Sequence, residues 1–205
     1  MKKWFVAAVF LLLIGSVPGS EAERLWKKGR VFYLKKEYAQ AVECYRKAAE
    51  AGYAPAQNSL GCCYLAGRGV RKNPSMACHY FQKAADQGDA RGINNVGFCY
   101  LYGFGYVNYP LFAADHSRRA ADLGLAEAQY NHADLTRLGM GTSRNISRAL
   151  DYYRKAAEAG CRPAMQTLAD WYEQGGQGLA RDTRKAGEWK TLSIRENNQK
   201  EESVQ

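Results

Sequence analysis

The side chains best suited to chemistry in this 205-residue sequence are three histidines and six cysteines. Cys78 and His79 are adjacent, so on a helix they would point apart, while His116 and His132 lack a Cys-x-x-Cys or His-x-x-x-His partner. The sequence contains no Gly-x-Ser-x-Gly elbow and no Ser-x-x-Lys motif, and its Gly-rich loops follow no predicted strand. We therefore predict no catalytic residues, no metal site and no cofactor.

The N-terminal residues resemble an export signal. Residues 1–3 are Met-Lys-Lys, residues 4–14 are an apolar run, and Ser20-Glu21-Ala22 is a small-residue site of the kind that signal peptidases cut. The apolar run has 11 residues, short of the roughly 20 that span a bilayer. We expect a signal peptide at residues 1–22 that is cleaved after Ala22, a secreted or periplasmic protein, and no transmembrane span in the mature chain.

The sequence is basic, with a net charge of +9 at pH 7. Cleavage after residue 22 removes Lys2, Lys3 and Glu21, which leaves 29 − 2 = 27 basic and 20 − 1 = 19 acidic residues and a net charge of +8. The basic residues are spread along the chain, so a solvated basic surface accounts for most of the excess. If the charge serves binding, an acidic peptide, a glycan or an anionic envelope surface fits an exported protein better than nucleic acid does.

The strongest pattern in the sequence is an internal repeat. The octapeptide YRKAAEAG occurs at residues 45–52 and again at 153–160, and the two intermediate steps of 36 residues hold FQKAADQG and SRRAADLG. Such a period is typical of a repeat array. Each period contains two stretches with apolar residues at helical spacing, which we name helix A and helix B. We predict an all-α solenoid of about five stacked helix-turn-helix repeats, with units at residues 23–53, 54–89, 90–125, 126–161 and 162–194 and a polar tail at 195–205.

Capping residues support this division. Asn73-Pro74 predicts the start of helix B in the second unit, and Asn145 and Asp182 stand at the same place in later units. Glycines predict left-handed ends of helix B at Gly52, Gly88, Gly124 and Gly160.

At these columns the sequence resembles the Sel1-like repeat family, a subset of the tetratricopeptide-like solenoids. The resembling motifs include Leu60-Gly61, Tyr64, the loop Gly67-Arg68-Gly69-Val70, Tyr80-Phe81 and Lys83-Ala84-Ala85. The resemblance covers residues 54 to about 194. The first unit departs from it, because 12 residues separate Gly29 from Ala41 where 16 separate Gly61 from Ala77, as in an ordinary tetratricopeptide repeat. The resemblance implies a monomeric, non-catalytic scaffold or adaptor that binds a protein or peptide.

An enzymatic alternative comes from the same family. Some cysteine-rich Sel1-like proteins of bacteria have been credited with penicillin binding and weak β-lactamase activity, and they join each helix B to the next helix A through cysteines eight residues apart. The corresponding positions here, such as Ala49 with Gln57 and Ala85 with Ile93, hold no cysteine. This departure removes the specific link, so a penicillin-binding or weak β-lactamase function is the second hypothesis.

The helix contact of these relatives suggests disulfide candidates. Antiparallel neighbours keep a constant sum of residue numbers, which is 106 for Ala49 with Gln57 and also for Cys44 with Cys62. At the next junction the sum is 178 for Ala85 with Ile93 and 177 for Cys78 with Cys99. We therefore expect these two cysteine pairs, although the sum does not fix which way each side chain faces.

The binding surface follows from the curvature of helical solenoids, whose inner wall is lined by helix A. Asn58 and Asn94 occupy the column where tetratricopeptide relatives often hold the backbone of a bound peptide, which amide side chains suit because they both donate and accept. Aromatic and arginine side chains are the usual anchors of an interface. The partner-binding residues that we predict from helix A are Trp26, Arg30, Asn58, Asn94, Phe98, Tyr102, Tyr130 and Arg137.

Overall fold

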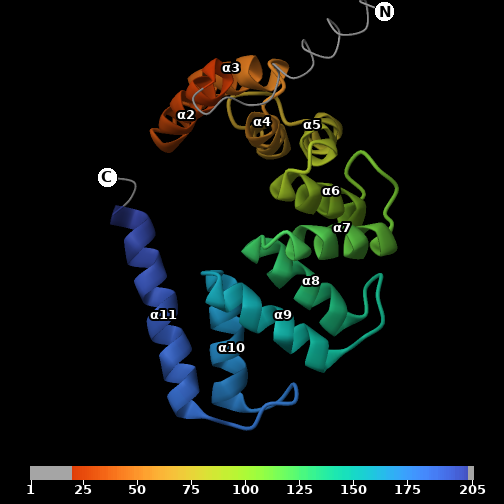
Figure 1. Cartoon of the computed structure of the whole chain (residues 1–205), viewed down its shortest axis with the longest axis vertical. Coiled ribbons are helices and arrows are strands. Elements are labelled where there is room, and N and C mark those ends of the chain that lie inside the picture. The colour runs from red at the N-terminus through yellow and green to blue at the C-terminus, as the bar shows by residue number, and fades with distance from the viewer. Residues whose placement is uncertain (1–19, 203–205) are drawn as a thin grey trace, which may run out of the picture.

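The computed structural model describes residues 20–202, and within this range the chain forms ten α-helices that stack in pairs. The A helices are α2 (Glu21–Leu34), α4 (Ala54–Ala66), α6 (Ala90–Tyr102), α8 (Ala126–Leu138) and α10 (Arg162–Gln174). The B helices are α3 (Tyr38–Glu50), α5 (Pro74–Asp86), α7 (Pro110–Asp122), α9 (Ile146–Glu158) and α11 (Thr183–Glu202). Figure 1 shows the pairs following one another around an open arc, with α2 near one end and α11 at the other. The predicted all-α solenoid of five helix pairs is confirmed.

The two ends of the chain differ from the predicted boundaries. Residues 1–19 and 203–205 lie outside the described residues, and with them most of the predicted signal peptide. Helix α2 already begins at Glu21, and the hydroxyl of Ser20 accepts the backbone N–H of Glu23, so the predicted cleavage site lies in the first turn of this helix. Helix α11 continues to Glu202 through most of the predicted polar tail, since no proline or glycine interrupts residues 195–202.

The helix ends follow the predicted capping chemistry. The side chains of Asn73, Asn145 and Asp182 accept backbone N–H groups at the starts of α5, α9 and α11, at 2.9–3.0 Å. The four glycines that follow α3, α5, α7 and α9 have φ between +80° and +84°, the left-handed conformation that ends a helix. In α5 and α9, caps of both kinds are present and set the two ends of the helix.

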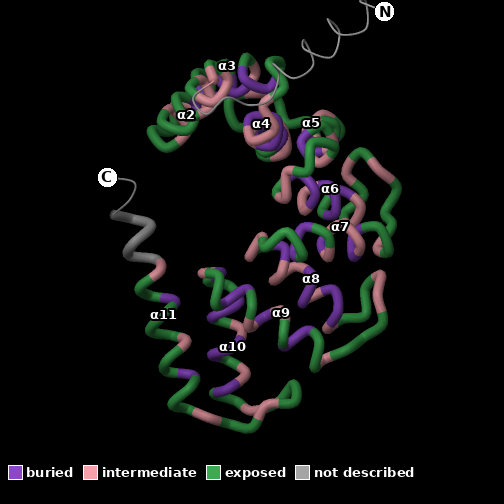
Figure 2. The backbone as a smooth tube through the Cα atoms, viewed as in Figure 1, coloured by how far each residue is buried: buried purple, intermediate pink, exposed green. Residues whose placement is uncertain are grey.

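Small side chains allow the pairs to pack closely. The first alanine of the repeated octapeptide is fully buried in each of the four copies, at Ala48, Ala84, Ala120 and Ala156. Within the second unit, a Cβ atom on Gly61 would lie 2.6 Å from the ring of Phe81, so α4 has no room for a larger residue at that position. Figure 2 shows buried residues recurring along the whole arc, which is typical of an elongated core built junction by junction. The octapeptide therefore recurs because each unit packs on its neighbours in the same way.

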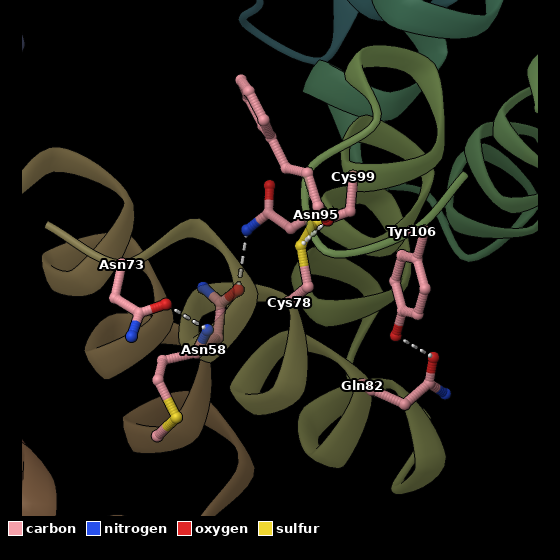
Figure 3. The surroundings of a disulfide bond; sticks show 9 residues. Asn58, Asn73, Cys78, Gln82, Asn95, Cys99 and Tyr106 are labelled. Atoms are coloured by element: carbon pink, nitrogen blue, oxygen red, sulfur yellow. Dashed lines mark hydrogen bonds between the residues drawn. A yellow bond between two sulfur atoms is a disulfide. The ribbon is translucent and has the colours of Figure 1, made fainter. Parts of the chain in front are cut away.

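One disulfide bond crosses a junction between units. Cys78 of α5 is bonded to Cys99 of α6, with a Cα–Cα distance of 6.2 Å (Figure 3). The bond therefore joins helix B of the second unit to helix A of the third.

The bond expected between Cys44 and Cys62 is wrong, because both thiols are free. The column of Cys78 is occupied by Val42 one unit earlier, and that of Cys99 by Cys63. Cys44 lies two residues past Val42 and Cys62 one residue before Cys63, so at about 100° per residue both side chains point away from the junction. Cys44 instead packs against Gly29 within its own unit, where a Cβ atom on the glycine would lie 3.1 Å from that of Cys44.

Candidate binding surface on the inner wall

Several hollows lie along the A helices, and three of them together hold the predicted binding residues. An N-terminal hollow of about 310 Å³ between α2 and α4 holds Trp26, Arg30 and Asn58. A central hollow of about 370 Å³ between α6 and α8 holds Asn94, Phe98, Tyr102 and Arg137. Tyr130 lies in a third, C-terminal hollow between α8 and α10. The structure thus places all eight residues on one wall but in three separate depressions.

Exposed aromatic and aliphatic side chains surround the central hollow. The rings of Phe98 and Tyr102 lie 4.4 Å apart on the last turn of α6, and Phe104 of the following loop lies within 6 Å of both. Leu138 and Met140 line the opposite side. The exposed fractions of Phe98, Tyr102, Leu138 and Met140 are 36%, 57%, 53% and 38%. An apolar surface of this kind, hollowed and bordered by polar groups, is typical of a protein interaction site.

The polar side of the central hollow is already engaged within the protein. Arg137 donates from Nε to the hydroxyl of Tyr153 at 3.1 Å and from Nη2 to Asp134 at 3.0 Å, and the Tyr153 hydroxyl donates to the same Asp134 oxygen at 2.5 Å. Burial raises the pKa of Tyr153 above its usual value, and the hydrogen bond to Asp134 adds to this effect. Arg137, Asp134 and Tyr153 are thus all bonded to one another. Arg137 therefore has a positioning role within the protein and is not a free anchor for a ligand.

The N-terminal hollow is lined by arginines that no carboxylate neutralises. Arg30 lies over the ring of Trp26 at 5.1 Å, and Arg91 reaches the same hollow from the first turn of α6. Within the described residues neither guanidinium forms an ion pair. Arg68 stands beside this hollow, since it donates to the hydroxyl of Tyr33 and lies over the Tyr33 ring at 5.6 Å. The surface around this hollow is therefore positively charged.

The two asparagines that we predicted to bind a peptide backbone are each engaged in a hydrogen bond within the protein. The Oδ1 atom of Asn58 accepts from Nδ2 of Asn95 at 2.8 Å, and that of Asn94 accepts from Nδ2 of Asn131 at 3.0 Å. Each bond joins a residue of one A helix to the residue 37 positions later on the next, as Figure 3 shows for Asn58 and Asn95. Asn58 is only 8% exposed, so most of its surface is closed to a ligand.

Related bonds extend this series, which we call the inner-wall ladder, to both sides. Nε1 of Trp26 donates to Oγ of Ser59 at 3.0 Å across a separation of 33, which is 37 less the four residues missing from the first unit. At the other end, burial raises the pKa of the Tyr130 hydroxyl. A hydrogen bond with Thr167, 37 positions later, partly opposes this rise. The ladder thus aligns consecutive A helices, and only its unbonded donors and acceptors face a ligand.

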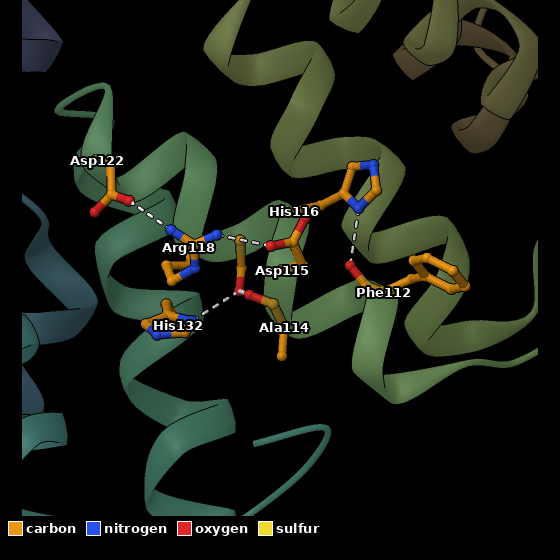
Figure 4. Close-up of polar contacts among 8 residues, drawn as sticks. Phe112, Ala114, Asp115, His116, Arg118, Asp122 and His132 are labelled. Carbon is orange, nitrogen blue, oxygen red and sulfur yellow. Dashed lines mark hydrogen bonds and ion pairs between the residues drawn. The ribbon is translucent and has the colours of Figure 1, made fainter. Parts of the chain in front are cut away.

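A serine and a histidine meet beneath the central hollow, which bears on the enzymatic hypothesis. Nδ1 of His132 lies 3.1 Å from Oγ of Ser117, and the serine hydroxyl donates to the Ala114 carbonyl at 2.9 Å (Figure 4). Because that hydroxyl has a single proton, the histidine is the donor in this pair and not the base that a nucleophilic serine needs. Both side chains are 3% exposed. Their arrangement is that of a satisfied polar pair in a core.

The residues described in the structure include no group of three His, Cys, Asp or Glu side chains placed to hold a metal ion. Between residues 20 and 202, no helix has the length and apolar character needed to cross a membrane.

Several residues of this surface were not among our predictions. Leu138 and Met140 line the central hollow from the last turn of helix A and the loop after it, and Arg91 lines the N-terminal hollow from the first turn of α6. Phe104, in the loop after α6, packs against Phe98 and Tyr102. A signal existed for Phe104, because Arg68 stands at the same place in the second unit, so an apolar residue had replaced a basic one. The ion pair between Arg137 and Asp134 could also have been predicted, since Asp134 precedes Arg137 by three residues.

Comparison with known proteins gives a consistent result. The Sel1 repeat model matches residues 27–53, 54–89, 90–125, 126–161 and 163–198, and so includes the first unit, which we had set apart from the resemblance. No curated protein matches the chain. A Sel1 repeat protein from Oxalobacter formigenes is 32% identical over 83% of this chain and 68% of its own, with a TM-score of 0.69.

Two further solved structures resemble the chain less closely. A protective antigen present in uropathogenic Escherichia coli strains, which displays an SLR fold, is 26% identical with a TM-score of 0.55, and the match covers 85% of this chain and 46% of the antigen. An immunity protein from Pseudomonas aeruginosa shares the fold at 19% identity and a TM-score of 0.54, over 86% of this chain and 82% of its own. Solenoids of this type typically serve as scaffolds for protein interactions.

Proposed function

Because the chain belongs to the Sel1 repeat family, we propose that it is a non-catalytic adaptor that binds a protein or peptide along its inner wall. The observation that carries this proposal is the exposed cluster of Phe98, Tyr102, Leu138 and Met140 around the central hollow. Aromatic side chains that are held by neighbouring rings lose little conformational entropy on binding and make good anchors. The inner-wall ladder supports the same role, because it fixes the spacing of the A helices before a ligand arrives.

The test uses a matched pair of double variants. Phe98→Ala with Tyr102→Ala removes the anchors, whereas Val107→Ala with Leu111→Ala removes exposed apolar side chains that do not line the hollow and are 82% and 59% exposed. Proteins captured from cell extract by the tagged chain are identified by mass spectrometry, with circular dichroism confirming equal helicity. We expect a partner that the wild type and the Val107/Leu111 variant retain and the Phe98/Tyr102 variant loses. A partner set that is identical for all three proteins would contradict the proposal.

We also propose that the protein is exported and that residues 1–22 are its signal peptide. The basic start, the short apolar run and Ser20-Glu21-Ala22 support this. Cleavage after Ala22 would remove the Ser20 cap of α2, which costs about 1 kcal/mol of helix stability. The mass of the protein recovered outside the cytoplasm tests the proposal: a chain that begins at Glu23 is expected, and an intact chain confined to the cytoplasm would contradict it.

The hydrolase hypothesis gains no support from the Ser117–His132 pair, for the reason given above. We expect the purified protein not to hydrolyse the β-lactam nitrocefin. Saturable hydrolysis that is lost in Ser117→Ala would overturn this expectation, and His79→Gln, an exposed histidine on α5, serves as the control.

A further inference from the structure

The side chains of one column of the inner wall change character along the solenoid. This column is the position directly after the glycine or alanine that packs against helix B. It holds the cation Arg30 in the first unit, neutral Cys62 in the second and aromatic Phe98 in the third. In the fourth and fifth units it holds the anions Asp134 and Asp170. These positions are structurally equivalent, since each follows Gly29, Gly61, Gly97, Ala133 or Ala169. The wall therefore has a basic end, an apolar middle and an acidic end.

At the basic end the positive charge is available to a ligand. Arg30, Arg68 and Arg91 surround the N-terminal hollow, and within the described residues none of them forms an ion pair. The carboxylate of Asp89 lies beside Arg91, but its Oδ1 accepts the backbone N–H of Gly92 at 2.7 Å and so caps α6. Arginine donors left without an acidic partner are suited to carboxylates, which they bind through paired hydrogen bonds.

In the middle of the wall the available surface is apolar. Phe98 and Tyr102 are exposed, while the nearby Arg137 is held by Asp134 and Tyr153. The exposed Asp170 would repel an acidic segment, and the charge of Asp134 is balanced by Arg137, so the far end offers such a segment no attraction. A ligand with an acidic part and an apolar part would match both regions.

On the basis of the proposed function, we infer that the inner wall binds a peptide segment whose acidic side chains contact Arg30 and Arg91 and whose aromatic or large aliphatic side chain enters the central hollow. Arg30 lies on α2, two helix spacings from Phe98, and Arg91 lies seven residues before Phe98 on α6 itself. Adjacent helices are about 8–10 Å apart, so the span from Arg30 to Phe98 is about 16–20 Å, which an extended chain covers with about five or six residues, and the span from Arg91 along α6 is shorter, about 10 Å. The amide of Asn94, whose Nδ2 is not used in the bond to Asn131, stands along this span and suits a peptide backbone.

The test is a thermodynamic cycle with synthetic peptides and the full chain, measured by isothermal titration calorimetry. The probe carries a pair of glutamates, a Gly/Ser spacer of about five residues and a phenylalanine, and is made in both sequence orders because the wall does not fix the direction of the chain. A second probe has glutamines in place of the glutamates. The protein variants are Arg30→Gln with Arg91→Gln, Phe98→Ala, and Lys47→Gln as a control that removes a positive charge outside the hollows.

We expect one order of the acidic probe to bind the wild type about tenfold more tightly than the glutamine probe, and the difference to vanish in the Arg30/Arg91 variant. Phe98→Ala should weaken both probes about tenfold, and Lys47→Gln should change neither. Added salt should reduce only the advantage of the acidic probe.

Four results would overturn the inference. The first is equal binding of acidic and glutamine probes to the wild type, and the second is an acidic advantage that survives in the Arg30/Arg91 variant. The third is no binding of either probe while the Phe98/Tyr102 variant still loses a captured partner, which leaves the adaptor function intact. If no partner depends on Phe98 and Tyr102 but the acidic advantage requires Arg30 and Arg91, the adaptor proposal fails on its own. The fourth is binding of anionic vesicles but not of the peptides, which would mean that the basic end contacts a membrane surface.

Discussion

Tyr45 and Tyr153 begin two identical octapeptides, and the structure gives them different roles. Both rings are buried in the same column of helix B. The hydroxyl of Tyr153 is bonded to Asp134 and Arg137, whereas Tyr45 lines the N-terminal hollow beside Arg30 and forms no hydrogen bond within the described part of the chain. The residues equivalent to Asp134 and Arg137 in the first unit are Arg30 and Tyr33. The repeat therefore fixes where a side chain lies, and the neighbouring unit decides what it does.

The cysteine columns show the same contrast between the two parts of the solenoid. Cys99 meets Cys78 across the junction of the second and third units and forms a disulfide. Cys63, in the same column, meets Val42 across the preceding junction and stays a free, buried thiol in the same cluster as that valine. The first junction depends on packing alone, and the second is also covalent.

The largest expected effect comes from making the first junction like the second. Val42→Cys should place two thiols at the geometry of Cys78 and Cys99 and form a bond with Cys63. Closing a loop of this length stabilises the folded state by about 2–4 kcal/mol. The measurement is the midpoint of urea unfolding, with and without reductant, together with a thiol assay that should find one free thiol fewer than in the parent. An assay that finds one free thiol more than in the parent would show that the two junctions differ in geometry, and Val42→Ala controls for the lost packing.

Removal of one hydroxyl should separate the two tyrosines. Tyr153→Phe removes one hydrogen bond to Arg137 and one to Asp134, which then keep only their contact with each other, and should cost about 1–3 kcal/mol of unfolding free energy. Tyr45→Phe should change stability by less than about 0.5 kcal/mol, since its hydroxyl has no protein partner to lose. Both values come from urea unfolding of matched samples. Equal losses would mean that the Asp134–Arg137–Tyr153 contacts contribute nothing specific.

The fourth unit has a buried hydroxyl without a hydrogen-bond partner in the described range, at a position where the second and third units have tyrosines. Thr136 occupies the column of Tyr64 and Tyr100, is 1% exposed, and its Oγ1 has no hydrogen-bond partner among the described residues. Thr136→Val keeps the shape and removes this group, so it should stabilise the protein by about 1 kcal/mol. Thr191→Val is the control, because its hydroxyl is exposed and bonded to the Gly187 carbonyl. A stability loss in Thr136→Val would indicate that this hydroxyl is satisfied.

The smallest effect at neutral pH concerns His132, which stands where Leu60 and Val96 fill the same column. Burial, with Arg148 and Arg118 nearby, lowers the pKa of His132 below its usual value of 6.5. The unfolded chain therefore binds the proton first, and stability should fall as the pH drops below about 6.5 toward the lowered pKa. His132→Leu should leave stability nearly unchanged at pH 7.5 and make it less dependent on pH between 7 and 5. The exposed His79→Gln should keep the wild-type dependence, and an unaltered slope in His132→Leu would contradict the assignment.

Much of the fold could be predicted because its causes are local. The period of 36, the caps at Asn73 and Asn145 and the helix-ending glycines each depend on residues within one unit. The first unit was harder to assign, since its shorter loop hid a family match that the helix pair itself retains. For the candidate site, the sequence predicted the helices that carry it but not the contacts of each residue. Asn58 and Asn94 bond to residues 37 positions away, and Arg137 bonds to Tyr153 of the following helix.

The sequence by itself determined the repeat, the helix boundaries within the solenoid and the columns of helix A from which we propose that a ligand is bound. These follow from side-chain size, capping and helical periodicity, which act over a few residues. The tertiary structure decided which of two equivalent cysteines is bonded, which arginines remain free and which asparagines are already engaged. Each of those outcomes depends on the direction in which a side chain leaves its helix and on the neighbour that it meets, and a spacing in sequence does not specify either one.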